Sequence, residues 1–272
     1  MNVAEGLILG LVQGLTEFLP ISSSGHLVLA EDLLGVRTTG LTLEIFLHLG
    51  TMMSIIIAFR ADIGRLIKGT LSGIIRLPAE GLHRVYREND GFRLFCLMVI
   101  GSLPAAAVGF TLADTVESAF KNPSLVFLML ILTGIVLVSA RYASGKNGGN
   151  GPRRSFLIGI AQAFALIPGI SRSGTTIVAA LHLGLSPREA GLFSFMLALP
   201  AIFGASLVEA GSILSGGTSI EFWPIMTGTV AAFASGYLAI RWVMRLLDSG
   251  KFPYFAVYLW TVGILGVIVR LF

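Results

Sequence analysis

The sequence predicts an all-α integral membrane protein, and its composition and its apolar segments carry the prediction. Of the 272 residues, 54% are apolar and 12% are charged, which is about half the charged share of a soluble domain. Apolar stretches recur along the whole chain, so we expect one membrane domain over residues 1–272. The net charge of +4 comes from Lys and Arg between these stretches, as in cytoplasmic loops, which argues against nucleic acid as a partner.

Six stretches approach the length of about 20 apolar residues that a helix needs to cross the hydrocarbon core. They lie at Leu41–Phe59, Phe92–Ala113, Pro123–Ala140, Glu189–Glu209, Phe222–Trp242 and Pro253–Leu271. We expect each of them to be a transmembrane helix.

Two further apolar stretches, at 3–35 and 155–184, are interrupted by proline and by a cluster of serine and glycine. The interruptions are LPISSSGH at Leu19–His26 and PGISRSGT at Pro168–Thr175. Such a break exposes backbone N–H and C=O groups, which is tolerated at membrane depth only where the loop is buried in protein or lines a wet cavity. Both stretches are therefore predicted to be re-entrant helix-loop-helix hairpins.

The two interrupted stretches also match each other when residues 10–35 are aligned with residues 159–184 without a gap. The identical pairs are Gly10 and Gly159, Gln13 and Gln162, Ile21 and Ile170, Ser22 and Ser171, Ser24 and Ser173, Gly25 and Gly174, Ala30 and Ala179, Leu34 and Leu183, and Gly35 and Gly184. Three spans separate the hairpins, so the second must enter from the opposite face. We predict an inverted-topology repeat, with units at about 1–141 and 155–272 and a basic cytoplasmic loop at about 60–92.

The positive charges give this topology an orientation. Most Lys and Arg fall in three regions that lie on one side of the membrane if there are six spans and two hairpins. The positive-inside rule assigns that side to the cytoplasm. The first hairpin is then expected to enter from outside and the second from inside.

The polar residues of both hairpins predict an anion site. Gln13 and Glu17 are four residues apart and share one helix face. The first loop adds Ser22, Ser23, Ser24, Gly25 and His26, and the second adds Ser171, Arg172, Ser173, Gly174, Thr175 and Thr176. Broken helices direct backbone N–H groups and positive dipole ends at the gap, and a guanidinium there suits phosphate oxygens.

These residue types also suggest chemistry. Glu17, with Gln13 beside it, suits a divalent cation, Mg²⁺ or alternatively Ca²⁺, that bridges diphosphate oxygens. His26 is three residues from Ser23 and suits the deprotonation of a serine or a water. Structural alternatives stand beside each role: close helix packing for the Ser and Gly runs, an ion pair between the hairpins for Glu17 and Arg172, and an interior histidine for His26.

Two motifs, QGLTEFLPISSSGH at Gln13–His26 and PGISRSGTT at Pro168–Thr176, resemble the signature motifs of the bacterial undecaprenyl-diphosphate phosphatases, the bacitracin-resistance membrane phosphatases. The resemblance covers the whole chain and includes FSFMLALPA at Phe193–Ala201. It implies hydrolysis of undecaprenyl diphosphate to undecaprenyl phosphate, the lipid carrier recycled for peptidoglycan. It also implies a site that opens to the outer side of the inner membrane, and dependence on a divalent metal.

By the same resemblance, Glu17 is the motif acid, Ser23 the nucleophile, His26 the motif histidine and Arg172 the phosphate-binding arginine. Gln13 stands where many relatives carry Glu, which bears on metal affinity. Whether Ser23 is phosphorylated or water attacks directly stays open, as does a homodimer. The alternative functions are a polyprenyl-phosphate transporter using the same anion site and a structural or assembly protein.

Overall fold

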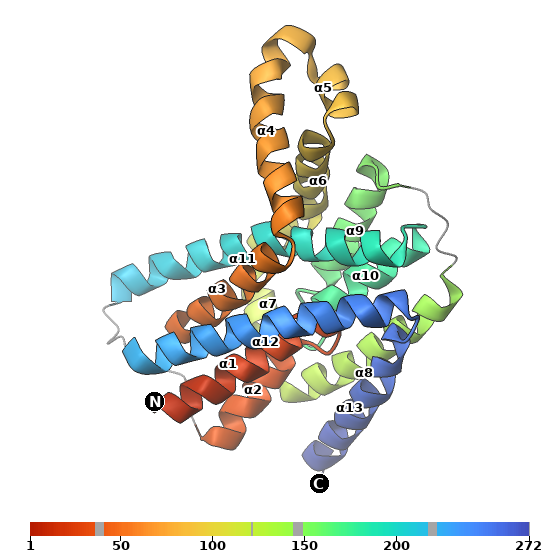
Figure 1. Ribbon diagram of the computed structural model, residues 1–272. Coiled ribbons are helices and arrows are strands. Elements are labelled where there is room, and N and C mark those ends of the chain that lie inside the picture. The colour runs from red at the N-terminus through yellow and green to blue at the C-terminus, as the bar shows by residue number, and fades with distance from the viewer. Residues whose placement is uncertain (36–40, 121, 144–148, 217–221, 272) are drawn as a thin grey trace.

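The computed structural model of the protein describes residues 1–35, 41–120, 122–143, 149–216 and 222–271, and every regular element within these ranges is a helix. The elements, which Figure 1 colours along the chain, are α1 (Val3–Phe18), α2 (Ser23–Leu34), α3 (Leu41–Ala58), α4 (Arg60–Glu80), α5 (Leu82–Glu88), α6 (Asp90–Thr111), α7 (Ala113–Phe120), α8 (Pro123–Ser139), η1 (Ala140–Tyr142), α9 (Pro152–Phe164), α10 (Arg172–His182), α11 (Pro187–Gly216), α12 (Phe222–Asp248), η2 (Phe252–Tyr254) and α13 (Phe255–Leu271). The all-α prediction is confirmed.

Among the described residues, five helical segments are long and apolar enough to cross a membrane, those of α6, α8, α11, α12 and α13. Helices α3 and α4 meet the same criteria together as a pair, with a bend of 87° between them. Each of the six predicted spans coincides with one helix, namely α3, α6, α8, α11, α12 or α13. The chain is therefore a multi-pass membrane protein.

Both interrupted stretches form helix-loop-helix hairpins, α1–α2 and α9–α10. Helix α1 ends at Phe18, and Leu19 is extended (φ −64°, ψ 145°), because the ring of Pro20 disfavours helical backbone at the preceding residue. In the second loop, Gly169 has a φ of +91°. A Cβ added there would lie 2.3 Å from the carbonyl oxygen of Val126, so this turn requires glycine.

Each hairpin packs against a helix from the other half of the chain. Helix α1 packs along α12, and α9 packs along α6, an arrangement that Figure 1 shows for the red α1 beneath the blue α12. The contacts are backbone to backbone: a Cβ on Gly10 would lie 2.2 Å from the Gly228 carbonyl oxygen, and one on Gly159 would lie 2.2 Å from that of Gly101. The halves are thus interleaved, while the entry of the hairpins from opposite faces stays a prediction.

A Gly10→Ala variant is expected to lose about 1–3 kcal/mol of stability, because the new methyl group overlaps the Gly228 carbonyl and forces α1 away from α12. Gly204→Ala on α11 is the matched control, since a Cβ there meets no atom within 4 Å. The measurement is thermal unfolding of both variants in detergent. A melting temperature of Gly10→Ala equal to that of the wild type would contradict the close packing.

The main hydrophobic core joins both halves beside the first loop. Phe18, at the end of α1, is fully buried, and its ring meets Phe195 of α11 edge-on at 5.6 Å between centroids. Phe195 also contacts Phe59 at 5.9 Å. The α1–α2 loop is thereby fixed against the second half, and its polar residues are held at a defined place.

The basic segment predicted as a loop at about 60–92 is mostly helical. Helices α4 and α5 cover it and project from the bundle in Figure 1. Arg76 donates to both carboxylate oxygens of Glu80, at 2.7 and 2.6 Å, and to Glu88 at 3.0 Å. The guanidinium lowers the pKa of Glu80 below its usual range. Because these groups are partly exposed, the ion pairs add little stability.

Candidate active site

The two hairpins meet at the carboxylate of Glu17, which is 8% exposed. Its Oε1 accepts a hydrogen bond from Nη2 of Arg172 at 2.6 Å. Its Oε2 accepts one from Oγ of Ser23 at 2.6 Å and one from Nε2 of Gln13 at 3.1 Å. The predicted common face of Gln13 and Glu17 is confirmed, and one carboxylate joins residues from both loops.

Local structure places these side chains at two helix starts. Ser23 is the first residue of α2, and Arg172 is the first residue of α10. Ser171 caps α10, because its Oγ accepts a hydrogen bond from the Gly174 N–H at 3.1 Å. The positive ends of both helix dipoles therefore lie at the Glu17 cluster, which favours a bound anion.

Arg172 has a donor group to spare. Its Nη1 is buried and has no hydrogen-bond partner among the described residues, while Nη2 is bound to Glu17. A buried donor without a partner is costly, as is a buried ion pair whose geometry does not satisfy every group. A phosphate oxygen would satisfy the unpaired N–H groups of Nη1 with a charge-assisted hydrogen bond.

His26 lies on the first turn of α2 but does not bond Ser23 in this structure. Its Nδ1 is 2.9 Å from the carbonyl oxygen of Ser22, and its Nε2 is 2.6 Å from the hydroxyl of Tyr258 on α13. The acceptor of the Ser23 hydroxyl is Glu17. The role of His26 as the base for Ser23 stays a prediction, and it would require the imidazole to exchange partners.

The remaining predicted phosphate ligands fall into two groups. Ser22 and Ser24 pair through their hydroxyls at 3.3 Å, and Ser171 and Ser173 do the same in the second loop at 3.3 Å. Thr176, by contrast, is fully buried, and its hydroxyl lies 2.6 Å from Ser194 of α11. That hydroxyl is engaged in helix packing in this structure.

The two predicted glycines of the site bring the structural elements close together. A Cβ on Gly174 would lie 3.1 Å from Cβ of Pro20 in the first loop, and one on Gly25 would lie 3.2 Å from Cγ1 of Val126. Ser173 adds a bond across the hairpins, from its Oγ to the Leu19 carbonyl at 3.3 Å. The Gly174 and Ser173 contacts therefore join the two loops, and the Gly25 contact places the first hairpin against α8.

Two residues near the site escaped prediction from the sequence. Thr133 of α8 accepts a hydrogen bond from the Ser171 N–H at 3.2 Å, and its own hydroxyl is 3.1 Å from the Gly169 carbonyl. Tyr258 of α13 meets His26. Both lie in apolar spans, where the only available signal is a polar group at membrane depth.

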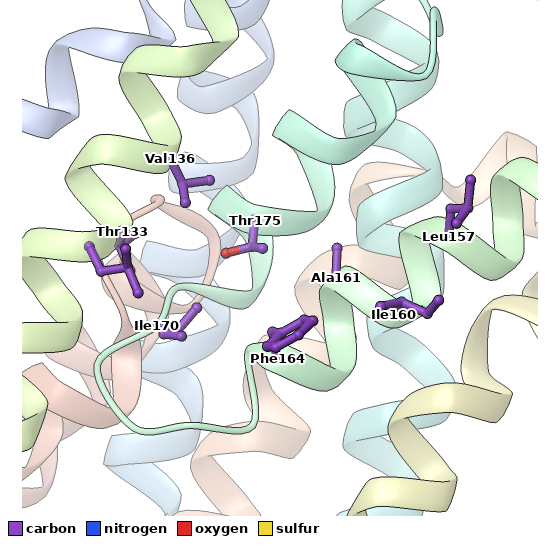
Figure 2. Close-up of a pocket in the computed structure, with 9 residues that line it drawn as sticks. Thr133, Val136, Leu157, Ile160, Ala161, Phe164, Ile170 and Thr175 are labelled. Carbon is purple, nitrogen blue, oxygen red and sulfur yellow. The ribbon is translucent and has the colours of Figure 1, made fainter.

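An apolar cavity of about 350 Å³ lies beside the second hairpin. Figure 2 shows its lining from α8, α9, the loop and α10. The lining residues are Leu132, Thr133, Val136, Leu157, Ile160, Ala161, Phe164, Ile170 and Thr175. Of the polar residues expected in the second loop, Thr175 lines this cavity, whereas Glu17, Ser23 and Arg172 do not. The Glu17 cluster therefore lies outside it.

Comparison with known proteins agrees with the motifs. Residues 6–265 match the family described as Bacitracin resistance protein BacA. A curated protein of Desulfosudis oleivorans, named undecaprenyl-diphosphatase, is 40% identical over 268 residues, covering 97% of each chain. Proteins of the same name from Methanobrevibacter smithii (39% over 281 residues, 100% of each chain) and Salinibacter ruber (37% over 265 residues, 97% of each) are also similar.

The family match spans nearly the whole chain, and it includes both hairpins and the spans that pack against them. The relatives are aligned over almost their full length. The chain therefore belongs to the bacitracin resistance protein BacA family.

Proposed function

We propose that this protein hydrolyses undecaprenyl diphosphate to undecaprenyl phosphate and inorganic phosphate. The observation that carries the proposal is the Glu17 cluster, in which a serine hydroxyl and a guanidinium share one buried carboxylate. The names of the relatives support the substrate. They give no support to the transporter that the sequence left open.

The geometry suggests how the chain's own residues act. Arg172 binds the terminal phosphate through its spare Nη1 and stabilises the charge that develops on the phosphate oxygens. Ser23 attacks the terminal phosphorus while its proton passes to Glu17, 2.6 Å away. The bond from that phosphorus to the bridging oxygen breaks, undecaprenyl phosphate leaves, and water then releases inorganic phosphate from Ser23.

Direct attack by water starts from the same arrangement, with the proton of the water passing to Glu17 or to His26. In either path the proton acceptor must be unprotonated at the start. The two paths differ in whether a phosphoserine forms, and the consequence of removing the Ser23 hydroxyl separates them.

We also propose a divalent cation, Mg²⁺ or Ca²⁺, held by Glu17 and Gln13. The described residues contain no group of three or more His, Cys, Asp or Glu that could hold a metal, so the diphosphate and water would supply the other ligands. Oε1 of Glu17 accepts a hydrogen bond from Nη2 of Arg172, and its second lone pair could bind the cation while Arg172 stays in place. When bound, the cation would withdraw charge from the diphosphate oxygens.

The setting of the reaction is part of the proposal. We propose the bacterial inner membrane, with the site open to the outer side, because the positive-inside rule places the basic loops in the cytoplasm. Recycling of the lipid carrier there supports peptidoglycan synthesis and gives bacitracin resistance, the property for which the family is named. Association as a homodimer is a further proposal, which light scattering of the purified protein tests.

The test is phosphate release from undecaprenyl diphosphate by the purified protein in detergent, with Mg²⁺, with Ca²⁺ and with EDTA. We expect release with a divalent cation and a loss of at least about tenfold in EDTA, the effect expected when Lewis-acid stabilisation is removed. Full activity in EDTA would contradict the cation alone. No release from folded protein under any of these conditions would contradict the hydrolase.

A further inference from the structure

His26, which follows Ser23 on α2, forms a hydrogen bond with Tyr258 of α13. The Tyr258 hydroxyl lies 2.6 Å from Nε2 of His26, and the two rings are nearly parallel, with 19° between their planes and 5.6 Å between centroids. The two residues are 232 positions apart in sequence. The contact therefore joins the first hairpin to the last span of the protein.

The Ser22 carbonyl determines the tautomer of the imidazole. Nδ1 faces the carbonyl oxygen of Ser22 at 2.9 Å, and a carbonyl only accepts, so Nδ1 carries a proton. In a neutral imidazole Nε2 then bears the lone pair, and the hydroxyl of Tyr258 must donate to it. Nε2, the nitrogen that can act as a base, is therefore the atom that is hydrogen-bonded to Tyr258.

The backbone of Ser22 contributes to this arrangement. Ser22 has a φ of +69°, and it is the one residue other than glycine with a positive φ among the described residues. A side chain in this region carries strain, which tends to persist where the surrounding structure requires it. The Ser22 carbonyl meets both the His26 N–H, at 3.3 Å, and the ring Nδ1.

The second hairpin provides an internal comparison. In the alignment of 10–35 with 159–184, Thr175 stands at the position of His26. The Thr175 hydroxyl is buried without a hydrogen-bond partner, and it borders the apolar cavity in Figure 2. The equivalent position of the second hairpin therefore has no hydrogen-bond partner, and a pair such as His26–Tyr258 is found only in the first hairpin among the described residues.

We propose that Tyr258 is a positioning residue for His26, an inference that rests on the proposed hydrolysis. The Ser22 carbonyl keeps the ring in the Nδ1–H tautomer, and the Tyr258 hydroxyl fixes the position of the ring through Nε2. Nε2 becomes the base when it exchanges the Tyr258 hydroxyl for the proton of the reacting group. Tyr258 acts through His26 and does not bind the diphosphate. Removal of the hydroxyl should therefore slow turnover without weakening substrate binding.

The test compares Tyr258→Phe with the wild type by kinetics and by ¹⁵N NMR of protein labelled at histidine, with the His26 signals assigned from a His26→Gln variant. We expect kcat of Tyr258→Phe to fall about tenfold, which is less than the loss expected when an acid-base group itself is removed. KM should stay within about twofold of the wild-type value. The His26 ring nitrogen shifts should move, because they report tautomer and hydrogen bonding. Tyr254→Phe is the matched control, since Tyr254 lies about one turn away and is 62% exposed.

A double variant keeps the inference falsifiable. If Tyr258 acts through His26, Tyr258→Phe should slow a His26→Ala enzyme no further. An additional loss in the double variant, a large rise in KM, or unchanged kcat and histidine spectrum in Tyr258→Phe would each overturn the inference. The NMR readout needs no substrate, so failure of the proposed hydrolysis would leave it interpretable.

Discussion

A Ser23→Ala variant is expected to release phosphate at least about 10³-fold more slowly than the wild type, an effect typical of the loss of a nucleophile. The Ser23 hydroxyl is placed for this role, because it donates to the buried Glu17 carboxylate at 2.6 Å at the start of α2. The substitution removes one oxygen atom and leaves the Glu17–Arg172 ion pair intact. The measurement is kcat for undecaprenyl diphosphate in detergent.

Ser118→Ala is the control for Ser23→Ala. Ser118 is exposed on α7, and its hydroxyl bonds only the Thr115 carbonyl of its own helix in the described structure. A folded Ser23→Ala protein that keeps kcat within about tenfold of the wild type would indicate direct attack by water, since the loss of a nucleophile costs far more.

An Arg172→Lys variant is expected to lose about 10²–10³-fold in kcat/KM, the range seen when a donor to the transition state is removed. Lysine keeps the positive charge, but it lacks the planar fork that lets Arg172 bond Glu17 through Nη2 while Nη1 remains available. The rate is measured beside the thermal unfolding of the same preparation. Arg87→Lys, at an exposed position of α5, controls for the general effect of the exchange.

The same variant separates a catalytic role of Arg172 from a structural ion pair with Glu17. A purely structural pair predicts a lower melting temperature and an unchanged rate per folded molecule. A role in binding phosphate predicts the reverse, with the rate lost in protein that stays folded. The pair is well buried, with side-chain exposures of 16% for Arg172 and 6% for Glu17. A structural role should therefore change the melting temperature by a measurable amount, and a role in binding phosphate should change the rate by a measurable amount.

The spans and hairpins could be predicted from sequence because the bilayer imposes strict local rules. A helix must be apolar over its full crossing, and a break must carry proline, glycine or polar groups. The helices α6 and α8, for example, begin and end within a few residues of the predicted spans. The helical form of 60–92 was missed because positive charge indicates which side a segment lies on and not its backbone conformation.

The partners of individual side chains were harder to predict. Sequence places Ser23 near both Glu17 and His26, and local spacing does not decide between them. The structure decides through tertiary packing, because α13 brings Tyr258 to the imidazole and leaves the Ser23 hydroxyl to Glu17. A tyrosine in an apolar span does not indicate which residue of a distant helix it contacts, so such a contact is visible only once the fold is known.

The packing of α1 against α12 also bears on biosynthesis. Helix α1 leaves the ribosome about 200 residues before α12, which at about 5–20 residues per second corresponds to roughly 10–40 s. During that interval Gly10 of α1 lacks the α12 backbone against which it packs. For most of it the Glu17 carboxylate also lacks Arg172 of α10. Membrane insertion must therefore tolerate an unfinished N-terminal hairpin, and a chain that terminates before α12 presents quality-control proteases with an incomplete bundle.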